Sequence, residues 1–251
     1  MSMNNEEKET TFYEGRIADT YDRQRFDTAA GQLIHFTEWK MLRKAVGGYS
    51  DGIKILEVGC GTGRFIEELV KLKHEPEGMD PSEDMLEVCR KKLGESQAFF
   101  RRGEADQLPY GEGQFDFVYS IRVMNQVESV DYAHRAIAEM LRVTKPGGRV
   151  LIEYMDRRRS KFARRKVRLG KEWVNRRVDS DTRLDGSHLQ KMVVDAGARV
   201  EWRRGVFFLG MTSYYAAPKP LLSLVGGLDR LLSRCFPSLC SRCYLLIRKG
   251  N

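Results

Sequence analysis

The chain has 251 residues, of which 41% are hydrophobic and 31% charged, with a formal net charge of +8. This composition is that of a folded protein, excludes an intrinsically disordered chain, and suits one large α/β domain or two small ones. We expect no signal peptide and no membrane span, because Met1–Thr11 is polar and no run approaches the roughly 18 apolar residues that a span requires.

Hydrophobic patterning predicts helices and strands that alternate along most of the chain. The predicted strands are 54–58, one that ends at 80, 98–101, 115–119 and 149–153, and the predicted helices include two pieces within 12–46, separated at 28–31, and one at 130–143. Lys145–Gly148 is expected to be a tight turn, and Ser187 to cap a helix that Gly197 ends. Residues 198–208 and 244–248 are expected to pair antiparallel around a helical insert at 219–234. Such alternation implies parallel βαβ units and a sheet covered on both faces.

The positive charge is concentrated in one segment. Residues 157–177 contain eleven Lys or Arg and one acid, so this segment carries +10, and the net charge of +8 leaves −2 for the rest of the chain. Three roles fit the segment: a solvated helix face, contact with an anionic small substrate or lipid surface, or RNA binding.

The five cysteines are odd in number and scattered. This usage fits a reducing compartment better than a disulfide framework, so we expect a cytoplasmic protein. Cys235, Cys240 and Cys243 lie within nine residues but have no paired fourth ligand and no local histidine. We therefore expect no metal site.

Three glycines, Gly59, Gly61 and Gly63, follow the apolar strand 54–58 directly. Glycines at the start of a helix let backbone N–H groups approach a ligand. The dinucleotide fingerprint G-x-G-x-x-G would require a glycine at position 64, which is Arg64. An acid, Glu57, lies two residues before the first glycine.

Polar residues also follow the other central strands, where ligands bind in open α/β sheets. Asp80 ends the second strand, twenty-one residues after Gly59. At that offset a carboxylate can accept both ribose hydroxyls; the alternative is that Asp80 caps the helix after Pro81. Asp106, followed by Gln-Leu-Pro, comes after the third strand, and Ser120 ends the fourth.

These features, in this order, resemble the motifs of the class I S-adenosylmethionine-dependent methyltransferases over about residues 53–155. Ile17–Asp22 also resembles the N-terminal helix that closes over the cofactor in the small-molecule branch of that family. There Tyr21 and Arg25 could reach the methionine portion, although Tyr21 could instead only pack the helix onto the core.

The resemblance implies a Rossmann-like, doubly wound, mostly parallel seven-stranded sheet with an antiparallel last strand and helices on both faces. It implies one domain over 1–251, made of a helical cap at 12–46, a cofactor-binding core at 53–155, a basic lid-like insertion at 156–186 and a sheet-completing part at 187–251. The cofactor would be S-adenosylmethionine, and the residues that would bind it are Tyr21, Arg25, Glu57, Gly59, Cys60, Gly61, Gly63, Asp80, Pro81, Met85, Asp106, Gln107 and Ser120.

The resemblance further implies methyl transfer to a small-molecule acceptor, which could be anionic or lipid-like. The candidate acceptor-facing residues are Tyr13, Arg122, Asn125, Gln126, Tyr154 and Trp173. No catalytic residue is predicted, because the cofactor supplies an activated methyl group and a general base is needed only for some acceptors. Two alternatives stay open: an RNA methyltransferase that uses 157–177, and a regulatory protein that binds the cofactor without turnover.

Overall fold

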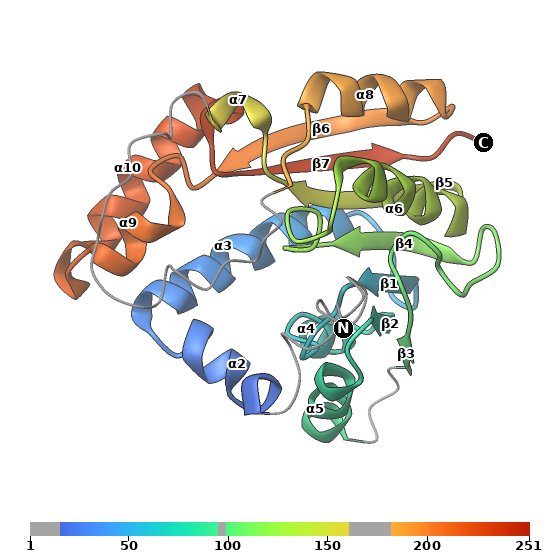
Figure 1. The fold of residues 1–251 in the computed structure, drawn as a ribbon, viewed down its shortest axis with the longest axis horizontal. Coiled ribbons are helices and arrows are strands. Elements are labelled where there is room, and N and C mark those ends of the chain that lie inside the picture. Colours follow the sequence, from blue (N-terminus) through green and yellow to red (C-terminus); the bar gives the residue numbers. More distant parts are fainter. Residues whose placement is uncertain (1–15, 95–98, 161–181) are drawn as a thin grey trace, which may run out of the picture.

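One mixed sheet runs through the part of the chain that the structure, a computed structural model, describes: residues 16–94, 99–160 and 182–251. Its strands are β1 (Lys54–Val58), β2 (Glu75–Asp80), β3 (Phe99–Arg102), β4 (Phe115–Ser120), β5 (Thr144–Tyr154), β6 (Arg199–Val206) and β7 (Arg242–Arg248). Their order across the sheet is β3-β2-β1-β4-β5-β7-β6 (Figure 1).

Strands β1 to β5 pair in parallel, and β7 pairs antiparallel with β5 on one side and β6 on the other. This confirms the predicted seven-stranded fold with its antiparallel last strand. The strand order reverses at β1, because β2 and β3 lie on one side of it and β4 and β5 on the other. In such sheets the carboxyl ends of the two strands at the reversal, here β1 and β4, flank the ligand site.

Helices cover both faces of the sheet (Figure 1). The helices are α2 (Arg16–Phe26), α3 (Ala29–Val46), α4 (Ile66–Lys71), α5 (Glu83–Leu93), α6 (Val130–Val143), α7 (Arg157–Ser160), α8 (Gly186–Asp195), α9 (Met211–Ala216) and α10 (Leu222–Cys235), with the short 3₁₀ turns η2 (Lys219–Leu221) and η3 (Pro237–Leu239).

Two large hydrophobic cores, one on each face of the sheet, lie within the described residues, beside a small third cluster of Cys60, Ile66 and Leu86. On one face, Ile137 of α6 and Leu189 of α8 pack against Val58 and Val118. On the other face, α3, α4 and α9 bury their apolar residues with the strand residues Phe117 and Tyr119. The central strands are therefore buried on both sides, which is why β1, after the exposed Lys54, is apolar except for Glu57 and does not alternate between apolar and polar residues.

Three local predictions are wrong in detail. The break between α2 and α3 is shorter than Thr28–Gly31, since Thr28 is the N-cap of α3 and its hydroxyl accepts from the backbone N–H of Gly31. The helix α8 is capped by Asp185, not Ser187, because the Asp185 carboxylate accepts from the N–H groups of Ser187 and His188. Lys145–Gly148 does not form a separate turn but lies within β5, at a register shift in its pairing with β4.

Other predictions fall partly or wholly outside the described residues. The helical cap predicted at 12–46 is described from Arg16 onward. The basic segment 157–177 is described only as far as Ser160, and Tyr13 and Trp173 are not described. The division of residues 1–251 into parts of a single domain stays a prediction.

Candidate functional site

The loop after β1 brings three glycines to the carboxyl edge of the sheet in the left-handed backbone region. Gly59, Gly61 and Gly63 have φ values of 75°, 53° and 67°. A Cβ on Gly59 would lie 2.2 Å from Cγ2 of Val123, so the loop packs directly against the segment after β4. A Cβ on Gly61 would have no described atom within 4 Å, so the described residues leave room for a ligand beside this backbone.

Asp80, at the end of β2, faces this loop. One carboxylate oxygen accepts from the N–H of Gly61 at 2.8 Å, and the other accepts from the N–H of Ser82 at 3.0 Å. Burial raises the pKa of Asp80 to about 6, although these two hydrogen bonds act to lower it. The N-cap of α5 is Ser82, whose hydroxyl accepts from the N–H of Met85. Of the two roles predicted for Asp80, the helix cap is therefore taken by its neighbour.

Glu57 is a buried acid in β1, two residues before the first glycine. Its Oε2 is buried and has no hydrogen-bond partner among the described residues. Burial raises the pKa of Glu57 to about 8, with Tyr119 and Arg64 acting in the opposite direction. A buried acid that has no ion-pair partner within residues 16–94, 99–160 and 182–251 fits a ligand that carries a positive charge, such as the amino group of S-adenosylmethionine.

The N-terminal helix α2 closes over the glycine loop through Asp22. Its carboxylate accepts from the hydroxyl of Thr62 at 2.7 Å and pairs with Lys92 of α5 at 3.1 Å. Of the two predicted cap residues, Tyr21 lies against Arg25, whose guanidinium carbon is 4.7 Å from the ring centroid. These contacts join α2 to the glycine loop through Asp22, while the cofactor contacts of Tyr21 and Arg25 stay predictions.

The loop after β3 presents two acids rather than one. Asp106, the predicted residue, accepts two hydrogen bonds from Arg135 of α6, at 2.8 and 3.0 Å, while Gln107 beside it is exposed. Glu104 accepts from the hydroxyl of Tyr132 and lies near enough to Asp80 to raise the pKa of that group further. Sequence reasoning missed Glu104, although it is the first acid after the end of β3.

Other predicted cofactor residues line the same edge. Cys60, between the first two glycines, is buried, as are Met85 and Asp80, and Pro81 follows Asp80 directly. Ser120, at the end of β4, is fully buried, and its hydroxyl donates to the carbonyl of Val58 at 2.9 Å. This bond ties the carboxyl ends of β1 and β4 together at the point where the strand order reverses.

Arg122 lies just after β4, on the side of the carboxyl edge that β4, β5 and β7 form, and its backbone is strained. Its φ is +67°, which a residue with a side chain rarely adopts, and it is 9% exposed. The backbone is held there from both sides, because its N–H donates to Glu153 at 2.5 Å and its carbonyl accepts from the side chain of Gln126. Its guanidinium donates to Glu38 of α3 at 2.7 Å.

Glu38 forms ion pairs with two arginines on this side of the edge. It is fully buried and pairs with Arg122 at 2.7 Å and with Arg64 at 2.6 Å. Burial alone would raise the pKa of Glu38, but the two guanidinium groups lower it to about 2. Arg64 also donates to His35 at 2.9 Å and lies over the ring of Phe26, so the network reaches the end of the cap helix.

Asn125 and Arg242 extend the network to β7. Arg242 donates to the side-chain oxygen of Asn125 at 2.7 Å and pairs with Glu153 at 3.1 Å. The predicted residues Arg122, Asn125 and Gln126 therefore lie together at one edge. Tyr154, also predicted, lies apart from them: it is fully buried, and its ring is 5.9 Å from the guanidinium carbon of Arg203.

The C-terminal cysteines do not form a ligand set in the part of the chain that is described. Cys240 and Cys243 are buried, whereas Cys235 is exposed at the end of α10. No group of three or more potential metal ligands occurs among residues 16–94, 99–160 and 182–251. Within the same residues, no helix has the length and apolar character needed to cross a membrane.

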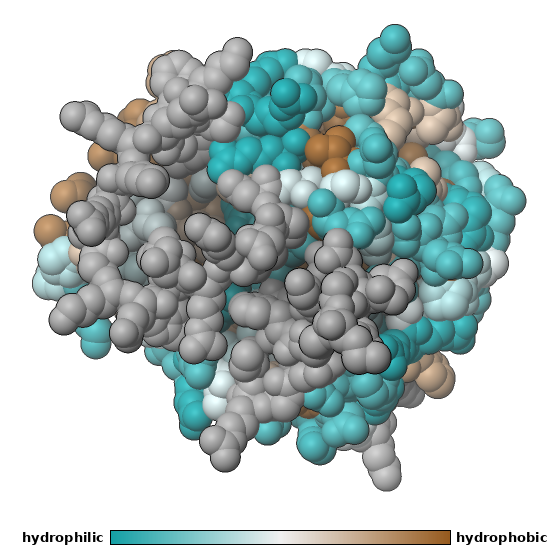
Figure 2. Space-filling model, viewed as in Figure 1, coloured by the Kyte–Doolittle hydropathy of each residue, from teal (hydrophilic) through white to brown (hydrophobic). Residues whose placement is uncertain are grey.

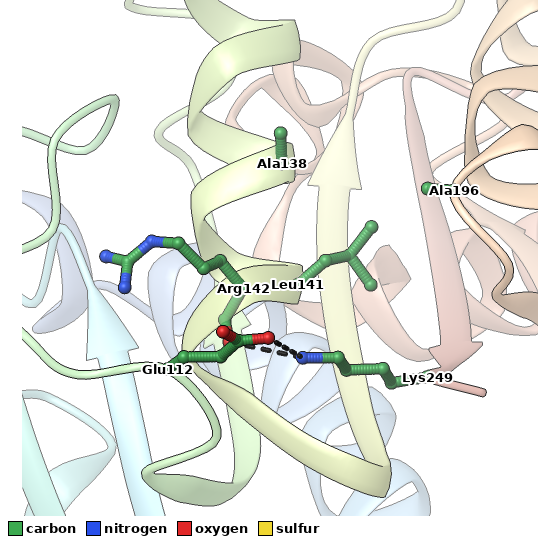
Figure 3. Close-up of a pocket in the computed structure, with 6 residues that line it drawn as sticks. All are labelled: Glu112, Ala138, Leu141, Arg142, Ala196 and Lys249. Atoms are coloured by element: carbon green, nitrogen blue, oxygen red, sulfur yellow. Dashed lines mark hydrogen bonds and ion pairs between the residues drawn. The ribbon is translucent and has the colours of Figure 1, made fainter. Parts of the chain in front are cut away.

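A shallow depression of about 270 Å³ lies away from the site (Figure 3). It is lined by Glu112, Ala138, Leu141, Arg142, Ala196 and Lys249. Arg142 precedes β5 and Lys249 follows β7, so the depression lies at the opposite edge of the sheet from the glycine loop. Its position gives it no part in the ligand chemistry of the carboxyl edge.

Comparisons with known proteins agree with the geometry. Residues 56–152 match the family described as Methyltransferase domain. Demethylmenaquinone methyltransferase of Halalkalibacterium halodurans is 34% identical over 149 residues, which cover 55% of this chain and 59% of that protein. The tRNA (carboxymethyluridine(34)-5-O)-methyltransferase of Macaca fascicularis is 26% identical over 196 residues, which cover 73% of this chain and 28% of that protein. The chain thus spans less than two thirds of the length of these curated relatives.

The fold also has a solved counterpart. Magnesium protoporphyrin IX methyltransferase from Synechocystis PCC 6803, with S-adenosylmethionine bound, superposes with a TM-score of 0.65 at 14% identity, over 99% of both chains. The strand order, the glycine loop and the family match point to the same conclusion. Residues 56–152 are therefore a methyltransferase domain, a family whose cofactor is S-adenosylmethionine. The sheet as a whole has the fold of the S-adenosylmethionine-dependent methyltransferases.

Proposed function

We propose that this protein transfers the methyl group of S-adenosylmethionine to a small-molecule acceptor, which could be anionic or lipid-like. The observation that carries the proposal is the buried Glu57 oxygen, which has no hydrogen-bond partner among the described residues and belongs to the strand that leads into the left-handed glycine loop. A site with a buried acid and open backbone at Gly61 suits a ligand with a cationic end.

The chain's own residues would hold the cofactor as follows. Glu57 would receive the amino group, the backbone of Gly59–Gly63 would lie along the ligand, and Asp80 would accept from the ribose hydroxyls. Glu104 and Asp106 would lie toward the adenine, and Tyr21 and Arg25 toward the methionine carboxylate. When bound, S-adenosylmethionine supplies an activated methyl group on a sulfonium. The protein then has to orient the acceptor and exclude water.

The acceptor would lie on the side of β4, β5 and β7. Arg122, Asn125, Gln126 and Arg242 line this side. Since Arg122 and Arg242 are paired with Glu38 and Glu153, they would offer an acceptor polar contacts rather than uncompensated charge. The curated relatives support a quinone-like acceptor, since one of them is a demethylmenaquinone methyltransferase. Cytoplasmic location stays a prediction from the cysteine usage.

Isothermal titration tests the proposal. S-adenosylmethionine and its demethylated product should bind, and NAD should not. Asp80→Ala should weaken the binding by more than ~1.5 kcal/mol, as expected for the loss of hydrogen bonds to a charged group. Asp131→Ala, which removes an exposed acid at the start of α6, is the matched control and should leave binding unchanged. Binding of NAD in place of S-adenosylmethionine would overturn the proposal, and unchanged affinity in Asp80→Ala would remove its ribose role.

RNA methylation is the second candidate. Two observations favour it: the charge of +10 over 157–177 and the similarity to a tRNA methyltransferase. If the protein binds RNA through this segment, nucleic acid should co-purify with it at low salt and be removed at high salt, because many phosphate contacts make binding steeply salt-dependent. Protein that is free of nucleic acid at low salt counts against this candidate.

A further inference from the structure

The helix α10 presents a row of exposed leucines along one side. Leu221, which precedes it, and Leu224, Leu228 and Leu231 are 49%, 69%, 48% and 58% exposed, at spacings of three, four and three residues. The buried residues of the helix, among them Gly226 and Asp229, lie on the other side. In Figure 2, hydrophobic atoms stand at the left rim, where Figure 1 places α9 and α10. A contiguous apolar row of this kind on a folded protein marks an interaction surface.

The charges around this row have one sign. Lys219, Arg230 and Arg234 are exposed. The single acid between residues 207 and 241 is Asp229, which is 3% exposed and accepts from the N–H of Leu209 at 2.8 Å. At helical spacing the two arginines border the leucine row, so their charged ends can reach polar groups while the leucines enter an apolar layer. We call these four leucines and three cations the leucine face.

A second copy of the chain fits this face poorly. In a symmetric dimer each patch meets itself, so the three cations of one copy would face those of the other. No exposed acid within 207–241 is present to compensate them. An anionic lipid surface provides the opposite charge at the border and an apolar interior for the leucines.

The leucine face is continuous with the acceptor side of the site. At the start of α9, the sulfur of Met211 accepts from Arg122 at 3.8 Å. Further along α9, the hydroxyl of Tyr215 donates to the carbonyl of Arg25 in the cap helix at 3.3 Å. The helix α10 in turn packs on α3, because a Cβ on Gly226 would lie 3.5 Å from Leu33. A lipid bound at the face would therefore lie beside the elements that border the acceptor.

We propose that the leucine face docks on the surface of a bilayer that contains anionic phospholipid. The proposal goes beyond the proposed function and is independent of it, since docking requires neither cofactor nor turnover. The leucines enter the boundary between headgroups and acyl chains, and Lys219, Arg230 and Arg234 remain among the phosphates.

Vesicle co-sedimentation of the full chain tests this assignment. Wild-type protein should bind vesicles of mixed phosphatidylglycerol and phosphatidylcholine, and bind pure phosphatidylcholine at least tenfold more weakly. The triple variant Leu224→Ser, Leu228→Ser, Leu231→Ser should lose at least tenfold in binding to the mixed vesicles while keeping every cation of the chain. The control Phe99→Ser, Val194→Ser removes side chains that are 72% and 61% exposed elsewhere and should bind as wild type does.

The triple variant also separates the leucine face from the basic segment 157–177. If charge on that segment alone holds the protein to vesicles, the variant will bind as tightly as wild type, and the proposal is overturned. Loss of a wild-type dimer in the triple variant, with no vesicle binding by either protein, would likewise overturn it in favour of self-association.

Fluorescence gives a second readout that does not depend on quantitative sedimentation. Leu228→Trp should gain emission that brominated lipids in the mixed vesicles quench, whereas Phe99→Trp should gain emission that they do not quench. Equal quenching in both variants, or none in Leu228→Trp, contradicts insertion of the leucine face.

Discussion

The two halves of the carboxyl edge of the sheet differ in whether their buried charged side chains have an ion-pair partner. On the side of β1 and β2, Glu57 and Asp80 are buried without an ion-pair partner among the described residues, and burial raises the pKa of both. On the side of β4, β5 and β7, Glu38, Arg122 and Glu153 each contact an opposite charge. The first half keeps two buried carboxyl groups that a cationic ligand can draw into the ionised form, and the second half uses its ion pairs to join α3, β4, β5 and β7.

We expect the largest effect on the free energy of unfolding from removing an ion-pair partner on the side of β4, β5 and β7. Glu38→Ala leaves Arg64 and Arg122 buried without their shared carboxylate, which should lower the free energy of unfolding by about 3–5 kcal/mol in urea titrations. Glu67→Ala, which removes an exposed partner of Lys71, is the control and should cost less than about 1 kcal/mol. Equal losses in the two variants would show that the buried network is not special.

Acid should weaken the same half in a defined direction. The pKa of Glu38 is about 2 in the folded protein against an ordinary 4.5, so the unfolded chain binds its proton more readily. Its contribution to stability is therefore complete above about pH 4.5 and is lost as the pH falls through about 2. The pH dependence of unfolding in Glu38→Gln should lack this component.

The unpaired half should respond to pH in the opposite sense. The pKa of Glu57 is about 8, so the carboxyl is largely protonated in the ligand-free folded protein at pH 7, whereas the unfolded chain loses this proton above about pH 4.5. The contribution of Glu57 to stability therefore falls as the pH rises from about 4.5 to 8. A cationic ligand favours the ionised form, so binding should release protons. We expect affinity for S-adenosylmethionine to rise between about pH 6 and 7.5, by at most tenfold per pH unit or about 1.4 kcal/mol.

Glu57→Gln supplies the control for this pH dependence. Titrations in buffers of different ionisation enthalpy measure the protons released, and the variant should release fewer at pH 7. If Glu57→Gln and wild type show the same slope, Glu57 does not receive the cationic end of the ligand.

The smallest effect concerns the link between the cap and the first half. Asp22→Ala removes the acceptor of the Thr62 hydroxyl and should weaken cofactor binding by about 1 kcal/mol, or several-fold. Asp19→Ala, on an exposed position of the same helix, should bind as wild type does. The ratio of dissociation constants from isothermal titration checks this, and equal values in the two variants would remove the role of the cap contact.

The first half of the edge could be predicted from local sequence, and the second could not. Strand β1, the glycines and Asp80 lie within 27 consecutive residues, and their spacing alone encodes the loop geometry. The contact of Glu38 with Arg122 joins residues 84 positions apart, and its carboxylate lies on a helix whose pattern indicates only an apolar face. Arg122 was predicted to face the acceptor. Its left-handed backbone could not be predicted, because the residue is not a glycine and its conformation depends on hydrogen bonds with Glu153 and Gln126.

Choosing among neighbouring acids was also beyond the sequence. Asp106 and Glu104 are two residues apart after β3, and the sequence favoured Asp106, which is followed by Gln-Leu-Pro. The structure shows that Asp106 pairs with Arg135 of α6, which lies 29 positions away in the chain. Only the packing of α6 against this loop shows that Asp106 is paired with a cation, whereas Glu104 bonds to Tyr132 and lies near Asp80.

The place of β7 in the sheet has a consequence for synthesis of the protein. Strand β6 is made before β7, yet its ladder in the described structure is with β7 alone, and β7 separates it from β5. As the chain emerges from the ribosome, β1 to β5 can pair with one another as each appears. Strand β6 has no strand to form backbone hydrogen bonds with until β7 is made. Stalling between Val206 and Arg242 would therefore expose this strand, and protection of the nascent chain matters most over that interval.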